Sequence, residues 1–137
     1  MKLCVIDASV VGPMILPDEA PDIPPQLMPV MIEGRALVPQ HWRLEVLNLG
    51  RTALRRKRID AQRLERALSI LSDYRIHLDD GTNRHAWGAC LELAARHDLT
   101  AYDAAYLELA IRAEAPLMTL DKALAKAARY EKLELIA

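Results

Sequence analysis

The sequence predicts an α/β fold, a three-layer sandwich with a mostly parallel central sheet of four to five strands. Short apolar runs, each long enough for one buried strand, alternate along the chain with longer segments of helical periodicity. The 137 residues, 52% of them hydrophobic, suit a single core and leave little room for a second domain. We therefore expect one domain over residues 1–137.

The predicted strands are short and apolar. The first run ends at Asp7, and a later run alternates between apolar and polar residues, which is typical of a strand. The predicted strands span residues 3–6, 36–38, 74–78, 117–119 and 133–136.

The predicted helices fill the segments between the strands. Gly12 and Pro13 weaken or kink the first helix, Asp60 is a plausible N-cap, and Pro116 follows the end of another helix. The proline-rich stretch 17–29 is the least regular part of the chain. The predicted helices span residues 8–16, 25–33, 40–57, 60–73, 82–97, 100–115 and 121–129.

Location and redox state follow from composition. No apolar run approaches the roughly 20 residues that a membrane helix needs, and Asp7 falls where a signal peptide would continue its apolar stretch. We expect a cytoplasmic protein without a membrane segment. Cys4 and Cys90 fit no metal-binding spacing and are interpreted as buried thiols rather than a disulfide.

The net charge of −1 gives no global basic field that would attract nucleic acid. Positive charge is concentrated in one stretch, which contains Arg51, Arg55 and Arg56 and continues through Lys57 and Arg58. Binding of a polyanion, if it occurs, is therefore expected to be local.

Four acidic residues lie near the start of a helix or the end of a strand, where they could converge. Asp7 closes the first strand and Asp121 follows the strand at 117–119, so both belong to the carboxyl edge of the sheet, where ligands bind in open α/β folds. Asp103 and Glu45 lie in the first turns of two helices. Each acid also has a purely structural interpretation: Asp7 and Asp121 as N-caps, Asp103 in a capping-box position, Glu45 as a solvated residue.

Three motifs resemble those of PIN-domain nucleases, and the closest likeness is to the VapC toxins of bacterial toxin–antitoxin pairs. Val5-Ile6-Asp7-Ala8-Ser9 resembles an apolar strand ending in Asp-x-Ser/Thr. The segment 100–106, Thr-Ala-Tyr-Asp-Ala-Ala-Tyr, resembles the second signature, and 117–121, Leu-Met-Thr-Leu-Asp, resembles the third. Glu45 resembles the acid of their acidic helix. A mild departure is Leu120-Asp121-Lys122, where a small residue and an arginine are commoner.

The resemblance implies in-line hydrolysis of RNA phosphodiester bonds with Mg²⁺ or Mn²⁺. Clustered carboxylates repel one another unless a cation is present, and Mg²⁺ prefers oxygen ligands. Asp7, Asp103 and Asp121 are then expected to bind the metal, and Glu45 to bind a second ion or orient the attacking water. Ser9 and Thr119 are assigned as supporting hydroxyls. Contacts to the RNA backbone are assigned to Arg51, Arg55 and Arg56. The arginine stretch has an equal alternative as a solvated helix end.

The resemblance also implies partners: a cognate antitoxin protein and a second copy in a homodimer. An antitoxin peptide is expected near Met14, Met28 and Met31, although ordinary core filling explains any single methionine as well. Trp42 and Trp87 lie on apolar helix stripes and are expected in the core. Surface or capping roles are expected for the histidines, which are His41, His77, His85 and His97.

Three other functions stay open at the level of sequence. A phosphoacceptor signalling domain has the same fold class and would use an acid after a middle strand, such as Asp79. A PIN-like domain can also serve as a non-catalytic binding module, but it would not need all four acids. A PIN nuclease in RNA processing, without a toxin role, has the same sequence features.

Overall fold

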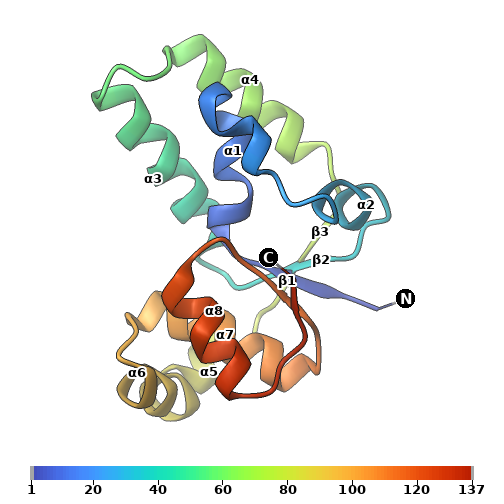
Figure 1. Cartoon of the computed structure of the whole chain (residues 1–137), viewed down its shortest axis with the longest axis vertical. Coiled ribbons are helices and arrows are strands. Elements are labelled where there is room, and N and C mark those ends of the chain that lie inside the picture. The colour runs from blue at the N-terminus through green and yellow to red at the C-terminus, as the bar shows by residue number, and fades with distance from the viewer. Residues whose placement is uncertain (1, 137) are drawn as a thin grey trace.

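The computed structural model describes residues 2–136 and has three layers, with a central five-stranded sheet between two groups of helices (Figure 1). The strand order is β3-β2-β1-β4-β5, and every neighbouring pair is parallel. The predicted fold class is confirmed, and the sheet is wholly parallel rather than mostly so. The strands are β1 Cys4–Ile6, β2 Ala36–Val38, β3 Ile76–Leu78, β4 Leu117–Met118 and β5 Leu135–Ile136.

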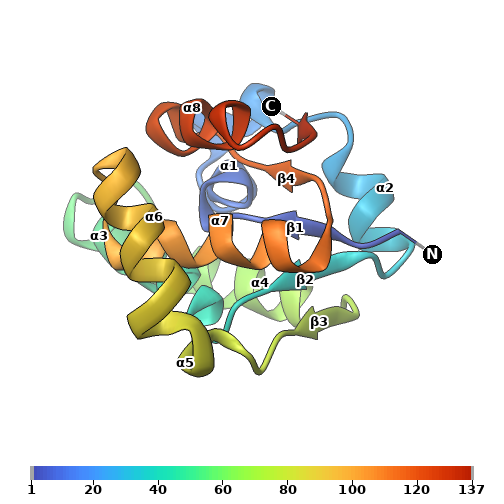
Figure 2. The same ribbon diagram turned by 90° about the horizontal axis from the view of Figure 1, so that it is seen from below.

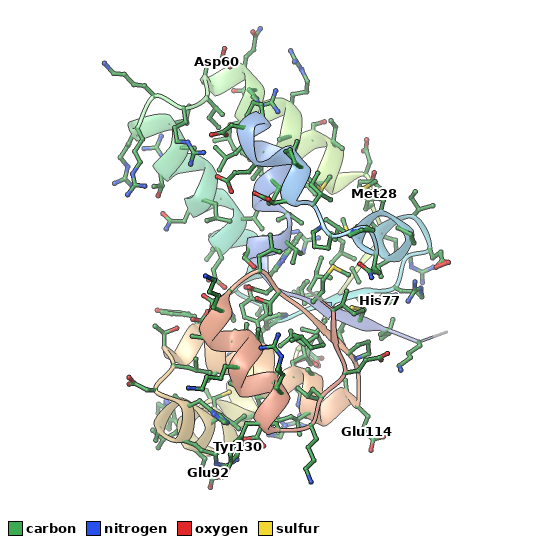
Figure 3. All side chains as sticks on the ribbon, viewed as in Figure 1. Met28, Asp60, His77, Glu92, Glu114 and Tyr130 are labelled. Atoms are coloured by element: carbon green, nitrogen blue, oxygen red, sulfur yellow. The ribbon has the colours of Figure 1, made fainter. Side chains whose placement is uncertain are left out.

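The first half of the helices covers one face of the sheet and the second half covers the other (Figures 1 and 2). On the first face lie η1 Ala8–Val10, α1 Gly12–Ile15, η2 Pro17–Asp22, α2 Leu27–Ile32, α3 Trp42–Arg55 and α4 Ala61–Ser72. On the second lie α5 Thr82–His85, η3 Ala86–Cys90, α6 Leu91–His97, α7 Ala101–Ala113 and α8 Lys122–Tyr130. Asp60, before α4, and Tyr130, at the end of α8, mark opposite ends of the molecule (Figure 3).

The core lies on both faces of β1 and β4. The strand residues Val5, Ile6, Leu117 and Met118 are completely buried, as apolar runs in a parallel sheet covered on both sides should be. Helix α7 packs against β1 and β4, and its residues 104–110 are all buried. A helix that is apolar almost all round belongs in the interior, so α7 holds Asp103, in its first turn, firmly against the sheet edge.

Two predicted helices are interrupted in the structure. The segment 8–16 divides into a 3₁₀ turn and a short helix that has Pro13 in its first turn, as the Gly12-Pro13 pair suggested. The segment 82–97 is divided by a π-helical stretch at Ala86–Cys90. Such an insertion changes the phase of the helix by about one residue, roughly 100°. The expectation for Trp87 was therefore wrong: its side chain is 94% exposed, whereas Trp42 is 2% exposed as predicted.

The cysteines and two of the three methionines named above lie in or against the core. Cys4 and Cys90 are buried and not joined to each other, and burial raises the pKa of the Cys4 thiol to about 11. Met31 is fully buried and Met14 packs against the core, so core filling explains both. Within residues 2–136, no helix is both long enough and apolar enough to span a bilayer.

Candidate active site

Four carboxylates from four elements line one pocket at the carboxyl edge of the sheet. Asp7 follows β1, Glu45 lies in the first turn of α3, Asp103 in the first turn of α7, and Asp121 directly precedes α8. The end of β1 and the starts of α3 and α8 lie close together at this edge of the sheet (Figure 1). The pocket has a volume of about 500 Å³ and also contains Ser9. The structure thus brings together all four acids named from the sequence.

Asp7 is fixed by two hydroxyl groups. Ser9 Oγ and Thr119 Oγ1 each donate a hydrogen bond of 2.7 Å to Asp7 Oδ2. These hydroxyls are themselves oriented, because Ser9 Oγ accepts the Leu120 N–H at 2.9 Å and Thr119 Oγ1 accepts the Asp121 N–H at 3.0 Å. Asp7 stands at the N-cap position of η1, but its side chain makes no capping hydrogen bond, so a cap does not explain its carboxylate. Both supporting hydroxyls lie where the sequence placed them.

Burial is the main reason that the pKa of Asp7 is raised. The residue is 5% exposed, and the carboxylates of Glu45 and Asp121 raise the pKa further. The bonds from the two hydroxyls oppose this rise. Oδ1 accepts no hydrogen bond from residues 2–136, so one oxygen of a buried carboxylate is left without a partner. Because this oxygen is not fully enclosed, water or a cation in the pocket can be its partner.

Glu45 is held by two side chains that the sequence analysis did not assign to the site. Tyr106 donates a hydrogen bond of 2.5 Å to Glu45 Oε1, and His41 Nε2 lies 3.1 Å from the same oxygen. His41 Nε2 also lies 3.2 Å from the Tyr102 carbonyl oxygen. Because both neighbours of Nε2 are acceptors, this nitrogen carries the proton. The i,i+4 spacing of His41 and Glu45 was the available signal for this contact.

Opposing effects act on the pKa of Glu45. Burial raises the pKa, but the hydrogen bonds from His41 and Tyr106 outweigh burial and bring it below its ordinary value. Glu45 is therefore ionised at neutral pH. Its charge, in turn, contributes to the raised pKa of Asp7 and Asp103.

Asp103 is a half-buried acid of the pocket whose pKa is strongly raised. Thr100 caps α7 by accepting the Asp103 N–H at 3.1 Å, so only the backbone of Asp103 takes part in the cap. Burial, and then the charges of Asp121, Asp7 and Glu45, raise the pKa of the Asp103 carboxyl to about 6. At neutral pH the Asp103 carboxyl therefore ionises beside other negative charges, which is unfavourable without a cation.

Asp121 combines a structural and a site role. Its Oδ1 accepts the Leu124 N–H at 2.9 Å and caps α8, as the structural interpretation held. The same side chain lines the pocket and raises the pKa of Asp103. The helix cap therefore fixes the carboxylate in place without removing it from the site.

The donor set of the pocket fits a hard divalent cation. Among the lining side chains that the structure describes, none is Lys or Arg, so no internal countercharge neutralises the carboxylates. Mg²⁺ binds through one or two carboxylates and keeps several waters, which a pocket of this volume accommodates. Within residues 2–136, no three acidic, imidazole or thiol groups stand close enough to enclose an ion directly. The fit therefore rests on oxygen donors and unbalanced charge.

The basic stretch lies at the other end of α3. Arg51, Arg55 and Arg56 are exposed and form no ion pair within the described part of the chain. Arg58 differs, because its guanidinium contacts Asp18 and Glu19 at 2.9 Å. Arg56 lines a hollow of about 320 Å³ that shares Ser9 and Leu49 with the carboxylate pocket. Of the three free arginines, Arg56 thus borders a surface that continues from the acids.

Comparison with known proteins gives the same fold and a family. The PIN domain model matches residues 4–130, nearly the whole chain, and PIN domains are generally metal-dependent nucleases. The crystal structure of PAE2754 from Pyrobaculum aerophilum is similar, with a TM-score of 0.62 over 92% of this chain and 84% of that chain. Its sequence identity is 17%, so this likeness concerns the fold. No curated protein matches the sequence.

Proposed function

Since the chain belongs to the PIN domain family, we propose that it is an endoribonuclease that hydrolyses RNA phosphodiester bonds with Mg²⁺ or Mn²⁺ at the pocket of Asp7, Glu45, Asp103 and Asp121. The observation that carries this proposal is the convergence of four carboxylates from distant parts of the chain, with no Lys or Arg among the described residues that line their pocket. Asp7 and Asp103 both have a raised pKa, first because burial disfavours the charged form and then because of the neighbouring carboxylates.

The residues of the pocket have distinct tasks in this proposal. Asp7, Asp103 and Asp121 would hold the metal, directly or through water. When bound, the ion acidifies water and neutralises charge on the phosphate. Ser9 and Thr119 hold one Asp7 oxygen so that the other faces the pocket.

Glu45 is suited to orient the attacking water. Its Oε1 accepts the bonds from His41 and Tyr106, which fix the direction of the carboxylate. The remaining oxygen, Oε2, accepts no hydrogen bond from residues 2–136. Because Glu45 is ionised, this oxygen can accept a hydrogen bond from the attacking water.

We further propose that the protein is the toxin of a type II toxin–antitoxin pair, acting in the cytoplasm as a homodimer with a cognate antitoxin. The support is the sequence resemblance to VapC toxins. Non-toxic RNA processing is the second candidate. A small antitoxin gene next to this one, whose product binds the chain and stops cleavage, supports the toxin role. Absence of such a gene, with normal growth on overexpression, supports RNA processing.

A cleavage assay tests the nuclease proposal. A labelled RNA of mixed sequence is incubated with the purified protein in Mg²⁺, in Mn²⁺ and in a chelator. We expect cleavage only with metal and none by Asp7→Asn, which removes a metal-binding charge but keeps the size of the side chain. Asp73→Asn is the matched control, since Asp73 is exposed and lies outside the pocket. Equal cleavage by wild type and Asp7→Asn would refute the proposal.

A further inference from the structure

A second hollow adjoins the carboxylate pocket on the side away from the arginines. It has a volume of about 230 Å³ and lies between the start of α3 and the helices α5, η3 and α7. His41 and Tyr102 line both hollows, so the two are separated only by these side chains. His41 is held in this position by its contacts to Glu45 and to the Tyr102 carbonyl oxygen.

The lining of this hollow differs from that of the carboxylate pocket. Its walls are small and apolar, from Ala86, Ala101, Ala105 and Cys90, and no Asp, Glu, Lys or Arg of the described chain lines it. Two amide side chains, Gln40 and Asn83, stand at its edge. Neither amide makes a hydrogen bond within residues 2–136, and both residues are exposed.

This combination suits a nucleobase better than a phosphate. A base has apolar faces that fit small apolar walls and a polar edge that hydrogen-bonds to amides, and Asn and Gln offer a donor and an acceptor together. In single-stranded RNA the base edges are free, so proteins read them in this way. A phosphate would need cationic side chains, which this lining lacks.

The order of the hollows along α3 places the base relative to the cleavage site. Gln40 and His41 lie at the start of the helix, Glu45 one turn later, and Arg56 just past its end. Each hollow shares two side chains with the next. An RNA strand along α3 would therefore meet the arginines, then the carboxylates, then the amide-edged hollow.

We propose that this second hollow, whose lining includes Gln40, Thr82 and Asn83, binds a base next to the scissile phosphate. The Gln40 and Asn83 amides then select which base is accepted. This inference rests on the proposed nuclease function, because the neighbouring phosphate must be held at the carboxylates. The protein then prefers one base at a single position beside the cut.

Cleavage of an RNA series tests the selection. The series has one sequence with each of the four bases placed in turn at the positions flanking the cut, and kcat/KM is measured for each RNA. We expect Asn83→Ala and Gln40→Ala to lower the preference for the favoured base about tenfold, a typical value for loss of one base-reading amide. Cleavage of the disfavoured RNAs should change little. Gln62→Ala, at an exposed amide of α4, is the matched control and should keep the preference.

A binding measurement separates this inference from the nuclease proposal. The side-chain amide signals of Asn83 and Gln40 are followed by ¹⁵N NMR while each of the four nucleosides, which carry no phosphate, is added. Shifts of these signals for one nucleoside support the hollow as a base site, even in a protein that cleaves no RNA. Active wild type with an unchanged base preference in both variants overturns the inference and leaves the nuclease proposal intact. A change of oligomeric state in Asn83→Ala also overturns it, because the hollow would then be covered by a second copy.

Discussion

Two clusters of acidic residues lie beside the ends of strands in the part of the chain that the structure describes, and only one of them contains its own cation. Beyond β3, Arg112 contacts Asp79 with two nitrogens, at 3.0 and 2.8 Å, and its Nε donates to Glu108 Oε2 at 2.6 Å. This pairing with Arg112 lowers the pKa of Asp79. Beyond β1 and β4, the acids of the carboxylate pocket have no such partner among residues 2–136, and the pKa of Asp7 and Asp103 is raised.

The difference distinguishes a structural acid from a functional one. Asp79 and Glu108 are satisfied by α7 itself, since Arg112 follows Glu108 by one turn, and they tie α7 to the edge strand β3. The pocket acids leave their charge unbalanced, which is unfavourable for folding and is retained where an external cation binds. The same contacts argue against a phosphoacceptor role for Asp79, because both of its oxygens are already engaged.

The sharpest way to break this comparison is to neutralise one acid in each cluster. Asp103→Asn should reduce RNA cleavage at least about hundredfold, because it removes a metal-binding charge. It should also raise the free energy of unfolding at pH 7, because the ionised Asp103 carboxyl is disfavoured in the folded protein. Cleavage rates and urea denaturation measure the two effects.

Asp79→Asn is the counterpart and should act in the opposite direction. It weakens the contacts of Arg112 and should lower the free energy of unfolding by about 2 kcal/mol, the range for hydrogen bonds to charged groups. Cleavage should be retained at a temperature where the variant is folded. Loss of cleavage in Asp79→Asn with unchanged stability would show that the two clusters are not functionally distinct.

The pH dependence of stability sharpens the comparison further. Without metal, an unfolded Asp103 loses its proton near pH 3.8, whereas the folded protein keeps it until about pH 6. The folded state therefore binds more protons between these values, and the free energy of unfolding should fall as pH rises from 4 to 6. Asp103→Asn should lack this part of the decrease. Thermal denaturation across this pH range in a chelator measures it.

Binding of a divalent metal ion should reverse this decrease in the free energy of unfolding. At pH 8 and a Mg²⁺ or Mn²⁺ concentration ten times Kd, the folded protein should gain about 1.4 kcal/mol. At pH 5 the gain should be smaller, because protons compete for Asp103. Asp79→Asn should keep the full gain. An equal gain at both pH values would show that the ion binds away from the perturbed carboxylates.

The sequence predicted the fold from short-range patterns, and it predicted the four acids from such patterns together with the resemblance to PIN-domain motifs. The apolar runs that end at Asp7 and just before Asp121 identify two strands, and the carboxyl ends of parallel strands lie at the same edge of a sheet. What it missed depends on exact helix phase. The π-helical stretch at Ala86–Cys90 turns Trp87 outward, and the contact of Tyr106 with Glu45 needs α3 and α7 to be placed side by side. Only the i,i+4 spacing of His41 and Glu45 was visible in the sequence, and no pattern marks the π-helical stretch or the contact of Tyr106.

The smallest expected effect concerns the free cations, the counterpart of the unbalanced acids. Replacing Arg51, Arg55 and Arg56 together by Gln should weaken RNA binding severalfold, about equally for all sequences, and should reduce the slope of log K against log salt by about 2 if each arginine contacts one phosphate of a single strand. Fluorescence anisotropy of a labelled RNA with catalytically inactive Asp7→Asn protein, at several salt concentrations, measures the slope.

A second triple variant controls for the change in overall charge. It replaces three exposed arginines outside α3, namely Arg66 in α4, Arg75 just before β3 and Arg129 in α8. Both triple variants lower the net charge from −1 by the same amount, so a general field would change binding equally in both. A reduced slope confined to the first variant places the RNA backbone along the end of α3. Equal slopes in both variants would instead mean that these arginines form a solvated helix end, where their charges interact with the α3 dipole rather than with RNA.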